Sequence, residues 1–192
     1  MSISAHKFVE ETPVCLESLV GKSISKSQAA ILWASVAEKK NIIICGSCGH
    51  GKTTLMEALI REVAKGRHQK NAYISLFSEM SFKPDENIRT FQGTGGNSKL
   101  ADLINTAIIE GAEYRFIDEV RLESDLESIE RAINSGLKVV FTVHGVYNVL
   151  SERLATLLGY DQDRTNQFLK NFNLKVEAKR LPGSERTIEI YE

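Results

Sequence analysis

The feature that most constrains this chain is a glycine-rich segment at residues 46–54, which reads Gly-Ser-Cys-Gly-His-Gly-Lys-Thr-Thr. Four apolar residues, 42–45, precede it in a predicted strand over residues 41–45, and residues 55–60, Leu-Met-Glu-Ala-Leu-Ile, follow it with helical character. A strand, a loop of the form Gly-x-x-x-x-Gly-Lys-Thr and a helix, in that order, are typical of a phosphate-binding loop. A chance glycine-rich turn is the alternative, and the correct flanks on both sides disfavour it. The segment therefore predicts an α/β fold that binds a nucleotide.

Each residue type in this loop suits the binding of a triphosphate. Glycines let backbone N–H groups turn inward around the α- and β-phosphates, and the following helix adds its positive dipole end. Lys52 supplies a charge for the β- and γ-phosphate oxygens, and the Thr53 hydroxyl is a ligand for Mg²⁺. We therefore expect ATP and Mg²⁺ as cofactors. The residues expected to contact the nucleotide are Gly46, Ser47, Cys48, Gly49, His50, Gly51, Lys52, Thr53 and Thr54.

Length and composition narrow the class of protein. The chain of 192 residues is long enough for one well-buried domain and too short for two. Its formal net charge of −1 does not indicate the excess of positive charge that is typical of nucleic-acid-binding proteins, so direct nucleic-acid binding is not expected. A membrane span needs about 18 consecutive apolar residues, and no stretch of the sequence is that long. Residues 1–7 lack the apolar core of a signal peptide. We expect a cytoplasmic protein.

Strand and helix patterns alternate after residue 40. The residues Ser25-x-x-Gln28 and Ser124-x-x-Glu127 are capping-box signatures that open two of the predicted helices. Predicted helices cover residues 25–40, 53–65, 99–110, 124–136 and 146–158, and predicted core strands cover 41–45, 72–77, 114–117 and 137–143. Residues 80–97 show little periodicity and are expected to form a loop.

The end of the chain predicts a different local arrangement. A polar helix or loop follows residue 158, and alternation over residues 174–178 with a return over 187–191 indicates an antiparallel hairpin around a Pro-Gly turn. The sum is an α/β three-layer sandwich with a mostly parallel core sheet and an antiparallel C-terminal hairpin.

Asp118 and Glu119 are the acidic residues best placed for chemistry on a triphosphate. They come directly after an apolar strand, so we expect them at the carboxyl edge of the sheet, where α/β ligand sites form. One acid would hold the metal, and the other would act on the attacking water. Acidic pairs after strands also commonly lead helices, which is the structural alternative. The expected metal ligands are Thr53, Asp118 and Glu119.

His144 ends the apolar strand 139–143, so its ring is expected at the same edge as Lys52 and Glu119. A role in sensing the γ-phosphate follows from that position, although a lone histidine is more often a packed or surface residue. Thr142, two positions earlier, lies on the same face. The expected catalytic residues are Glu119, His144 and Lys52.

Three further residues have weaker support. Arg121 is expected to bridge Glu119 to the phosphates or to a neighbouring subunit, and Arg89 to complete the site across a subunit boundary. Glu79, after the second strand, is a candidate additional acid. Exposed arginines and glutamates in loops are abundant, so a solvated role is the alternative for each.

Cys45 and Cys48 form a Cys-x-x-Cys pair inside the loop. A redox or zinc role would normally need a second Cys or His pair at the right spacing, which the sequence lacks. Small side chains filling a tight turn are the favoured interpretation. Oxidation of Cys48 would still impair ATP binding.

Five segments together resemble the traffic ATPases of the secretion superfamily, which drive type II and type IV secretion, conjugative transfer and type IV or tight-adherence pili. The loop at 46–54 is similar to that family's first motif, and 118–121, Asp-Glu-Val-Arg, is similar to its second acidic motif. The run 141–145 resembles its histidine box, 150–154 the helix after it, and 179–181 the start of its terminal hairpin. The resemblance covers essentially the whole chain and implies a RecA-like phosphate-loop motor domain.

The chain also departs from the family pattern. The acidic box after the second strand is replaced by Leu-Phe-Ser-Glu at 76–79, an expected arginine is replaced around 109–110, and Asp118 stands where a glycine is usual. Family members carry a large N-terminal domain, of which only the last strand, around 6–8, is expected here. We therefore assign residues 1–25 to an N-terminal strand and linker, and residues 26–192 to the ATPase motor domain.

The leading hypothesis is an ATP-hydrolysing motor subunit of a secretion, conjugation or pilus-assembly machine. The resemblance implies a homo-oligomer, a hexamer, that works with membrane-embedded machinery at the inner face of the membrane. The alternative is a nucleotide-gated adaptor with weak or partner-dependent ATPase activity. A small-molecule kinase or a DNA-handling ATPase has less support, because the sequence shows neither an arginine-rich lid nor a basic face.

Overall fold

The protein is described here by a computed structural model, which covers residues 14–66, 70–77, 80, 82, 87–93, 98–183 and 185–192. The expected N-terminal strand around residues 6–8 lies outside these residues. None of the helices in the described part of the chain is both long enough and apolar enough to span a bilayer.

A seven-stranded sheet forms the centre of the molecule, in the order β3-β2-β4-β5-β1-β6-β7. Every neighbouring pair is parallel except β6 and β7, which form the antiparallel C-terminal hairpin. The strands are β1 (Ile42–Gly46), β2 (Asn71–Ser75), β3 (Ile88–Gln92), β4 (Tyr114–Val120), β5 (Lys138–His144), β6 (Leu174–Arg180) and β7 (Arg186–Tyr191).

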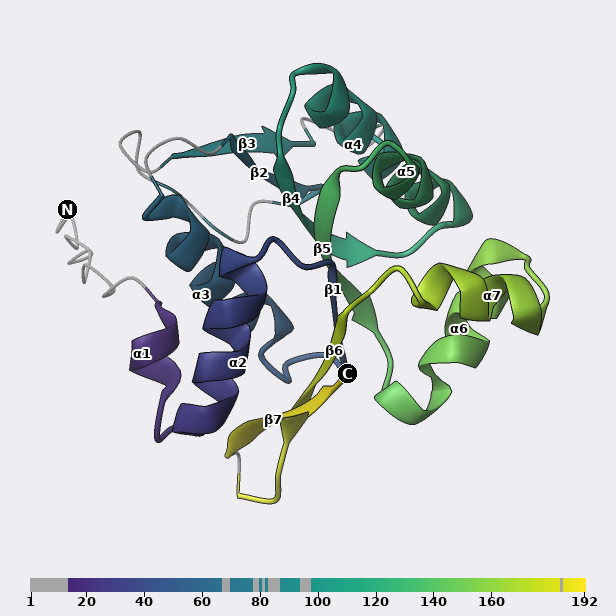
Figure 1. Ribbon diagram of the computed structural model, residues 1–192. Helices are drawn as coiled ribbons and strands as arrows, with labels where there is room; N and C mark the ends of the chain where they lie inside the picture. Colours follow the sequence, from purple (N-terminus) through teal and green to yellow (C-terminus); the bar gives the residue numbers. More distant parts are fainter. Residues whose placement is uncertain are drawn as a thin grey trace, which may run out of the picture.

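Helices cover both faces of the sheet, with α1 to α3 on one side and α4 to α7 on the other (Figure 1). They are α1 (Leu16–Leu19), α2 (Lys26–Ala37), α3 (Lys52–Ala64), α4 (Leu100–Ile109), α5 (Glu123–Asn134), the short 3₁₀ helix η1 (Tyr147–Val149), α6 (Leu150–Leu158) and α7 (Gln162–Leu169). The predicted three-layer α/β fold with a parallel core and an antiparallel hairpin is confirmed.

Alternation along the strands sends neighbouring side chains to opposite faces, as the two-residue period of a strand requires. Ile42 and Ile44 of β1 pack in the apolar cluster under α1 to α3, whereas Ile43 and Cys45 pack in the cluster under α4 to α7. Both faces of β1 are therefore buried, which explains why its sequence is a continuous apolar run.

The expected loop at residues 80–97 is wrong in part, because it contains β3. This strand lies at the edge of the sheet and pairs only with β2. Phe91 is the one buried side chain among the five residues of β3, so the strand lacks the apolar run that identified the central strands. An edge strand with a single buried position leaves almost no periodic signal.

Two predicted boundaries also change. Ser25 caps α2 as expected, with its Oγ accepting from the Gln28 N–H at 3.1 Å. Ser124, by contrast, lies inside α5, whose first turn is capped by Asp125: its Oδ2 accepts from the backbone N–H of Leu122 at 3.0 Å. The strand expected at 114–117 continues to Val120, so Asp118 and Glu119 lie within β4 and not after it.

Candidate functional site

The glycine-rich loop connects β1 to α3, and two of its glycines are required by its geometry. Gly46 has a φ of 148°, and a Cβ there would lie 2.5 Å from the Ala178 carbonyl oxygen of β6. Gly51 caps α3 in the left-handed region, with a φ of 95°. A side chain at either position would displace backbone or strain it, so the tight loop over the helix N-terminus depends on these residues.

Lys52 begins α3, and its Nζ donates to the Ser47 carbonyl oxygen at 3.1 Å. The ammonium group thus lies back over the loop and is held there by a neutral acceptor. His50 faces β6 instead, where its Nδ1 is 3.1 Å from the Ala178 carbonyl oxygen. The loop therefore places a cation among backbone N–H groups at the N-terminus of a 13-residue helix, an arrangement that favours phosphate.

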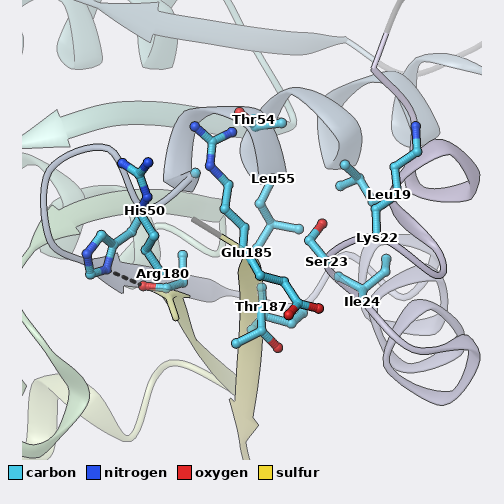
Figure 2. A pocket seen from close by; sticks show the side chains of 14 residues that line it. Leu19, Lys22, Ser23, Ile24, His50, Thr54, Leu55, Arg180, Glu185 and Thr187 are labelled. Carbon is cyan, nitrogen blue, oxygen red and sulfur yellow. Dashed lines mark hydrogen bonds between the residues drawn. The ribbon is translucent and has the colours of Figure 1, made fainter. Parts of the chain in front are cut away.

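A cavity of about 350 Å³ adjoins the loop. Three segments line it: the start of α3 with Thr54 and Leu55, the turn between α1 and α2, and the C-terminal hairpin. Figure 2 shows Ser23 and Ile24 on one side of this hollow, with His50 and Arg180 on the other. The sequence analysis did not identify the turn and the hairpin as parts of the site, because nothing in their local patterns marks them as neighbours of the loop.

Asp118 and Glu119 sit on a bulge in β4. Ile117 pairs with Phe141 and Val120 pairs with Val143, so two residues of β4 lie opposite the single residue Thr142 of β5. The bulge changes which side chains reach each face of the sheet, since Ile117 and Val120 both pack toward α4 and α5.

The Thr142 hydroxyl contacts both acidic residues. Its Oγ1 donates to Asp118 Oδ1 at 2.7 Å and accepts from the Glu119 backbone N–H at 2.7 Å. Tyr73 adds a longer hydrogen bond of 3.4 Å from its hydroxyl to Asp118 Oδ2. Asp118 is buried, whereas the Glu119 side chain is 40% exposed.

Glu119 has an unusual backbone, with a φ of 59° in the left-handed region. Its carboxylate forms an ion pair with the Arg121 guanidinium. The pair lies within one chain and is exposed, so it contributes little to stability. It does hold the carboxylate that was expected to act on water.

His144 ends β5 beside the loop, since it pairs with Gly46 of β1. Gly145 donates its N–H to the Gly46 carbonyl oxygen at 3.3 Å and so attaches the end of β5 to the first residue of the loop. The His144 side chain is exposed. The three adjacent strands β1, β5 and β4 thus bring the loop, His144 and the acidic pair to one edge of the sheet.

One other expected residue, Arg89, is not part of this edge. Arg89 lies toward the amino end of β3, where it pairs with Glu110 and lies over the Phe91 ring, 5.5 Å from its centroid. Glu79 lies outside the described residues. Arg89 does not approach the loop within its own chain.

The cysteines of the loop have very different environments. Cys45 is buried in β1, and burial raises the pKa of its thiol to about 12. Cys48 is exposed, and neither forms a disulfide. Within the described part of the chain, no group of at least three His, Cys, Asp or Glu side chains is arranged to hold a metal ion.

No family model matches the sequence, and no curated protein matches it. Solved structures do match the fold. The VirB11 ATPase from the Brucella suis type IV secretion system has a TM-score of 0.74 and 22% identity, covering 92% of this chain and 54% of that one. The Legionella pneumophila ATPase DotB has a TM-score of 0.75 and 19% identity, covering 93% and 50%.

The pilus retraction motor PilT, solved with bound ADP, has a TM-score of 0.71 and 20% identity, covering 94% of this chain and 52% of that one. The chain therefore spans about half the length of the structures that it matches. Together with the strand–loop–helix geometry and the sheet order, these matches show that the chain has the RecA-like α/β fold found in secretion and pilus ATPases.

Proposed function

We propose that this chain binds ATP with Mg²⁺ and hydrolyses it as the motor subunit of a secretion, conjugation or pilus-assembly machine. The observation that carries the proposal is the meeting of the glycine-rich loop, Asp118, Glu119 and His144 at the ends of three adjacent strands. The similarity in fold to VirB11, DotB and PilT supports the choice of machine.

The residues of the loop fit a triphosphate. Gly46 and Gly51 have backbone conformations that residues with a side chain rarely adopt, and a side chain at Gly46 would collide with β6. Without these side chains, the backbone N–H groups of the loop can face an anion. Lys52 donates to the Ser47 carbonyl, a neutral acceptor that it can exchange for phosphate oxygens. The cavity beside Thr54 and Leu55 is within the size range of ligand pockets and suits the base and ribose.

Each residue then has a distinct task. Lys52 and the loop amides hold the β- and γ-phosphates, and Thr53 with Asp118 holds the metal, which would neutralise charge on the phosphate oxygens. Glu119 orients and deprotonates the attacking water once its carboxylate leaves Arg121. His144, beside the first residue of the loop, responds to the γ-phosphate and passes that change to a neighbouring subunit.

A second candidate function is a nucleotide-gated adaptor with weak or partner-dependent turnover. The ion pair between Glu119 and Arg121 favours it, because the guanidinium occupies the carboxylate oxygen that would otherwise accept a hydrogen bond from the attacking water. A partner subunit that draws Arg121 away would then be needed for rapid hydrolysis.

Turnover and nucleotide affinity of single variants test the proposal. Lys52→Ala should abolish both, whereas Lys65→Ala, which removes the same charge from the other end of α3, should leave both unchanged. Glu119→Gln should keep ATP affinity and lower turnover by roughly 10²–10⁴-fold, as expected for loss of a general base. Full turnover in Glu119→Gln would show that this acid is wrongly assigned. A wild-type chain that binds ATP without turning it over would favour the adaptor.

Assembly is tested by native mass spectrometry with and without ATP and Mg²⁺. We expect a hexamer that forms or tightens with nucleotide, and His144→Ala should weaken this response more than it weakens ATP affinity. A monomer under all conditions would contradict the motor proposal. The membrane-embedded partner would bring the assembly to the inner face of the membrane.

A further inference from the structure

One buried hydroxyl group joins the two acidic residues of the site. Thr142 is fully buried in β5, and its Oγ1 both donates to Asp118 and accepts from the Glu119 N–H, each at 2.7 Å. A threonine hydroxyl has one proton to donate and two lone pairs. The single proton is therefore committed to Asp118, and the orientation of the hydroxyl is set by both neighbours.

The bulge explains why this hydroxyl is needed. In a regular parallel pair the N–H of a residue at position 119 would pair with a backbone carbonyl of the neighbouring strand, but the extra residue of β4 interrupts that ladder. The Glu119 N–H bonds to the Thr142 side chain instead. The same residue has a φ of 59°, a conformation that persists in a non-glycine residue only when its surroundings hold it.

Asp118 is also held through this group. Asp118 is buried, and its Oδ1 accepts a hydrogen bond from Thr142 Oγ1 with an oxygen–oxygen distance of 2.7 Å. The hydrogen bond from the Tyr73 hydroxyl to Asp118 Oδ2 is longer, at 3.4 Å. Thr142 therefore connects the Asp118 carboxylate to the backbone that carries the Glu119 side chain.

We propose that Thr142 is a positioning residue that couples the metal-binding acid to the catalytic acid. Its hydroxyl orients Asp118 toward Mg²⁺ and keeps Glu119 in the left-handed backbone that directs its carboxylate to the edge of the sheet. This inference rests on the proposed function. It adds that metal binding and water activation are linked by one hydroxyl group and are not independent.

The chain supplies matched variants to test the link. Thr142→Val keeps the shape of the side chain and removes the hydroxyl, while Thr142→Ser keeps the hydroxyl. Tyr73→Phe removes the hydrogen bond from Tyr73 to Asp118 and leaves the contact between Thr142 and Glu119 in place. Each variant is measured for affinity toward a fluorescent ATP analogue in EDTA, for the Mg²⁺ concentration that half-saturates its effect on that affinity, and for kcat at saturating Mg²⁺.

In Thr142→Val the affinity in EDTA should equal that of the wild type, because the loop is intact. The half-saturating Mg²⁺ concentration should rise and kcat should fall, each by roughly 10–100-fold, the usual effect of losing a group that orients a metal ligand. Thr142→Ser should restore both values. Tyr73→Phe should change both values much less than Thr142→Val does, because it leaves the Thr142 hydroxyl and its contacts with Asp118 and Glu119 in place. Thermal unfolding of each variant checks its folding, and Thr142→Ala replaces Thr142→Val if the latter does not fold.

Three results would overturn the inference. One is an unchanged Mg²⁺ response and kcat in Thr142→Val. Another is a Thr142→Ser that behaves like Thr142→Val, and the third is equal loss of affinity in EDTA and of kcat, which marks a merely structural role. If the wild type binds ATP without turnover, the proposed function fails, and the Mg²⁺ response of Thr142→Val and Thr142→Ser still decides whether Thr142 orients Asp118.

Discussion

Arg115 is the most unusual single residue of the core. It is fully buried in β4, between Ala72 and Val139 of the neighbouring strands, and none of its three guanidinium nitrogens has a hydrogen-bond partner among the described residues. Burial lowers the pKa of the guanidinium to about 10. A charge without a partner in this position opposes folding.

Replacing Arg115 by methionine should therefore stabilise the protein, by about 1–4 kcal/mol at pH 7 if the effect matches other buried charges replaced by apolar side chains. The advantage of Arg115→Met should shrink above pH 10, because the folded wild type then loses its buried charge while the unfolded chain, whose guanidinium pKa is higher, still keeps it. Urea unfolding of both proteins from pH 7 to 10.5 measures this. A less stable Arg115→Met at pH 7 would mean that the guanidinium has a partner in solution.

The two loop cysteines should differ in reactivity. Cys48 is exposed, whereas burial raises the pKa of Cys45 to about 12, so little thiolate forms there at pH 8. Iodoacetamide followed by peptide mapping should modify Cys48 and leave Cys45 intact in the folded protein. ATP with Mg²⁺ should slow the modification of Cys48, and Lys52→Ala should remove that protection. Equal labelling with and without ATP would argue against phosphate binding at this loop.

At the scale of elements, α5 depends on a cap that differs from the one its sequence suggests. Asp125 Oδ2 accepts from the N–H groups of Arg121 and Leu122, at 3.2 and 3.0 Å. Asp125→Ala should lower the free energy of unfolding by about 0.5–2 kcal/mol, the usual effect of a lost cap. Ser124→Ala is the matched control and should change it far less. Denaturant unfolding compares the two, and the reverse order would restore Ser124 as the cap.

The whole molecule should respond to nucleotide, because the loop and the cavity join segments from three parts of the chain. A ligand present at 100 times its Kd stabilises the folded state by about 2.7 kcal/mol. For a chain of this size that corresponds to a rise in Tm of roughly 5–10 °C. Thermal unfolding with ATP and Mg²⁺ measures the rise, which should vanish in Lys52→Ala. No rise in the wild type at millimolar ATP would contradict nucleotide binding.

Much of the fold followed from local patterns. The five-residue apolar run of β1 and the alternation in β6 and β7 each arise within one segment, since side-chain direction repeats along a strand. The edge strand β3 was not predicted, because only Phe91 among its residues is buried and one buried position gives no repeating apolar pattern. The assignment of residues 1–25 to a linker stays a prediction, and Leu16 and Ile24 within it are buried in the same cluster as α2 and α3.

The sequence by itself determined the glycine-rich loop, its flanking strand and helix, and the apolar strands that lead to Asp118, Glu119 and His144, because backbone conformation and side-chain direction depend on neighbours along the chain. Only the tertiary structure decided the bulge opposite Thr142, the hydrogen bond from the Glu119 N–H to Thr142, the cavity wall formed by the hairpin, and the burial of Arg115. Each of these is a relation between segments. The extra residue of β4 is recognised only when the paired positions of β4 and β5 are compared. A pocket wall likewise forms only when segments that are distant in the sequence pack together.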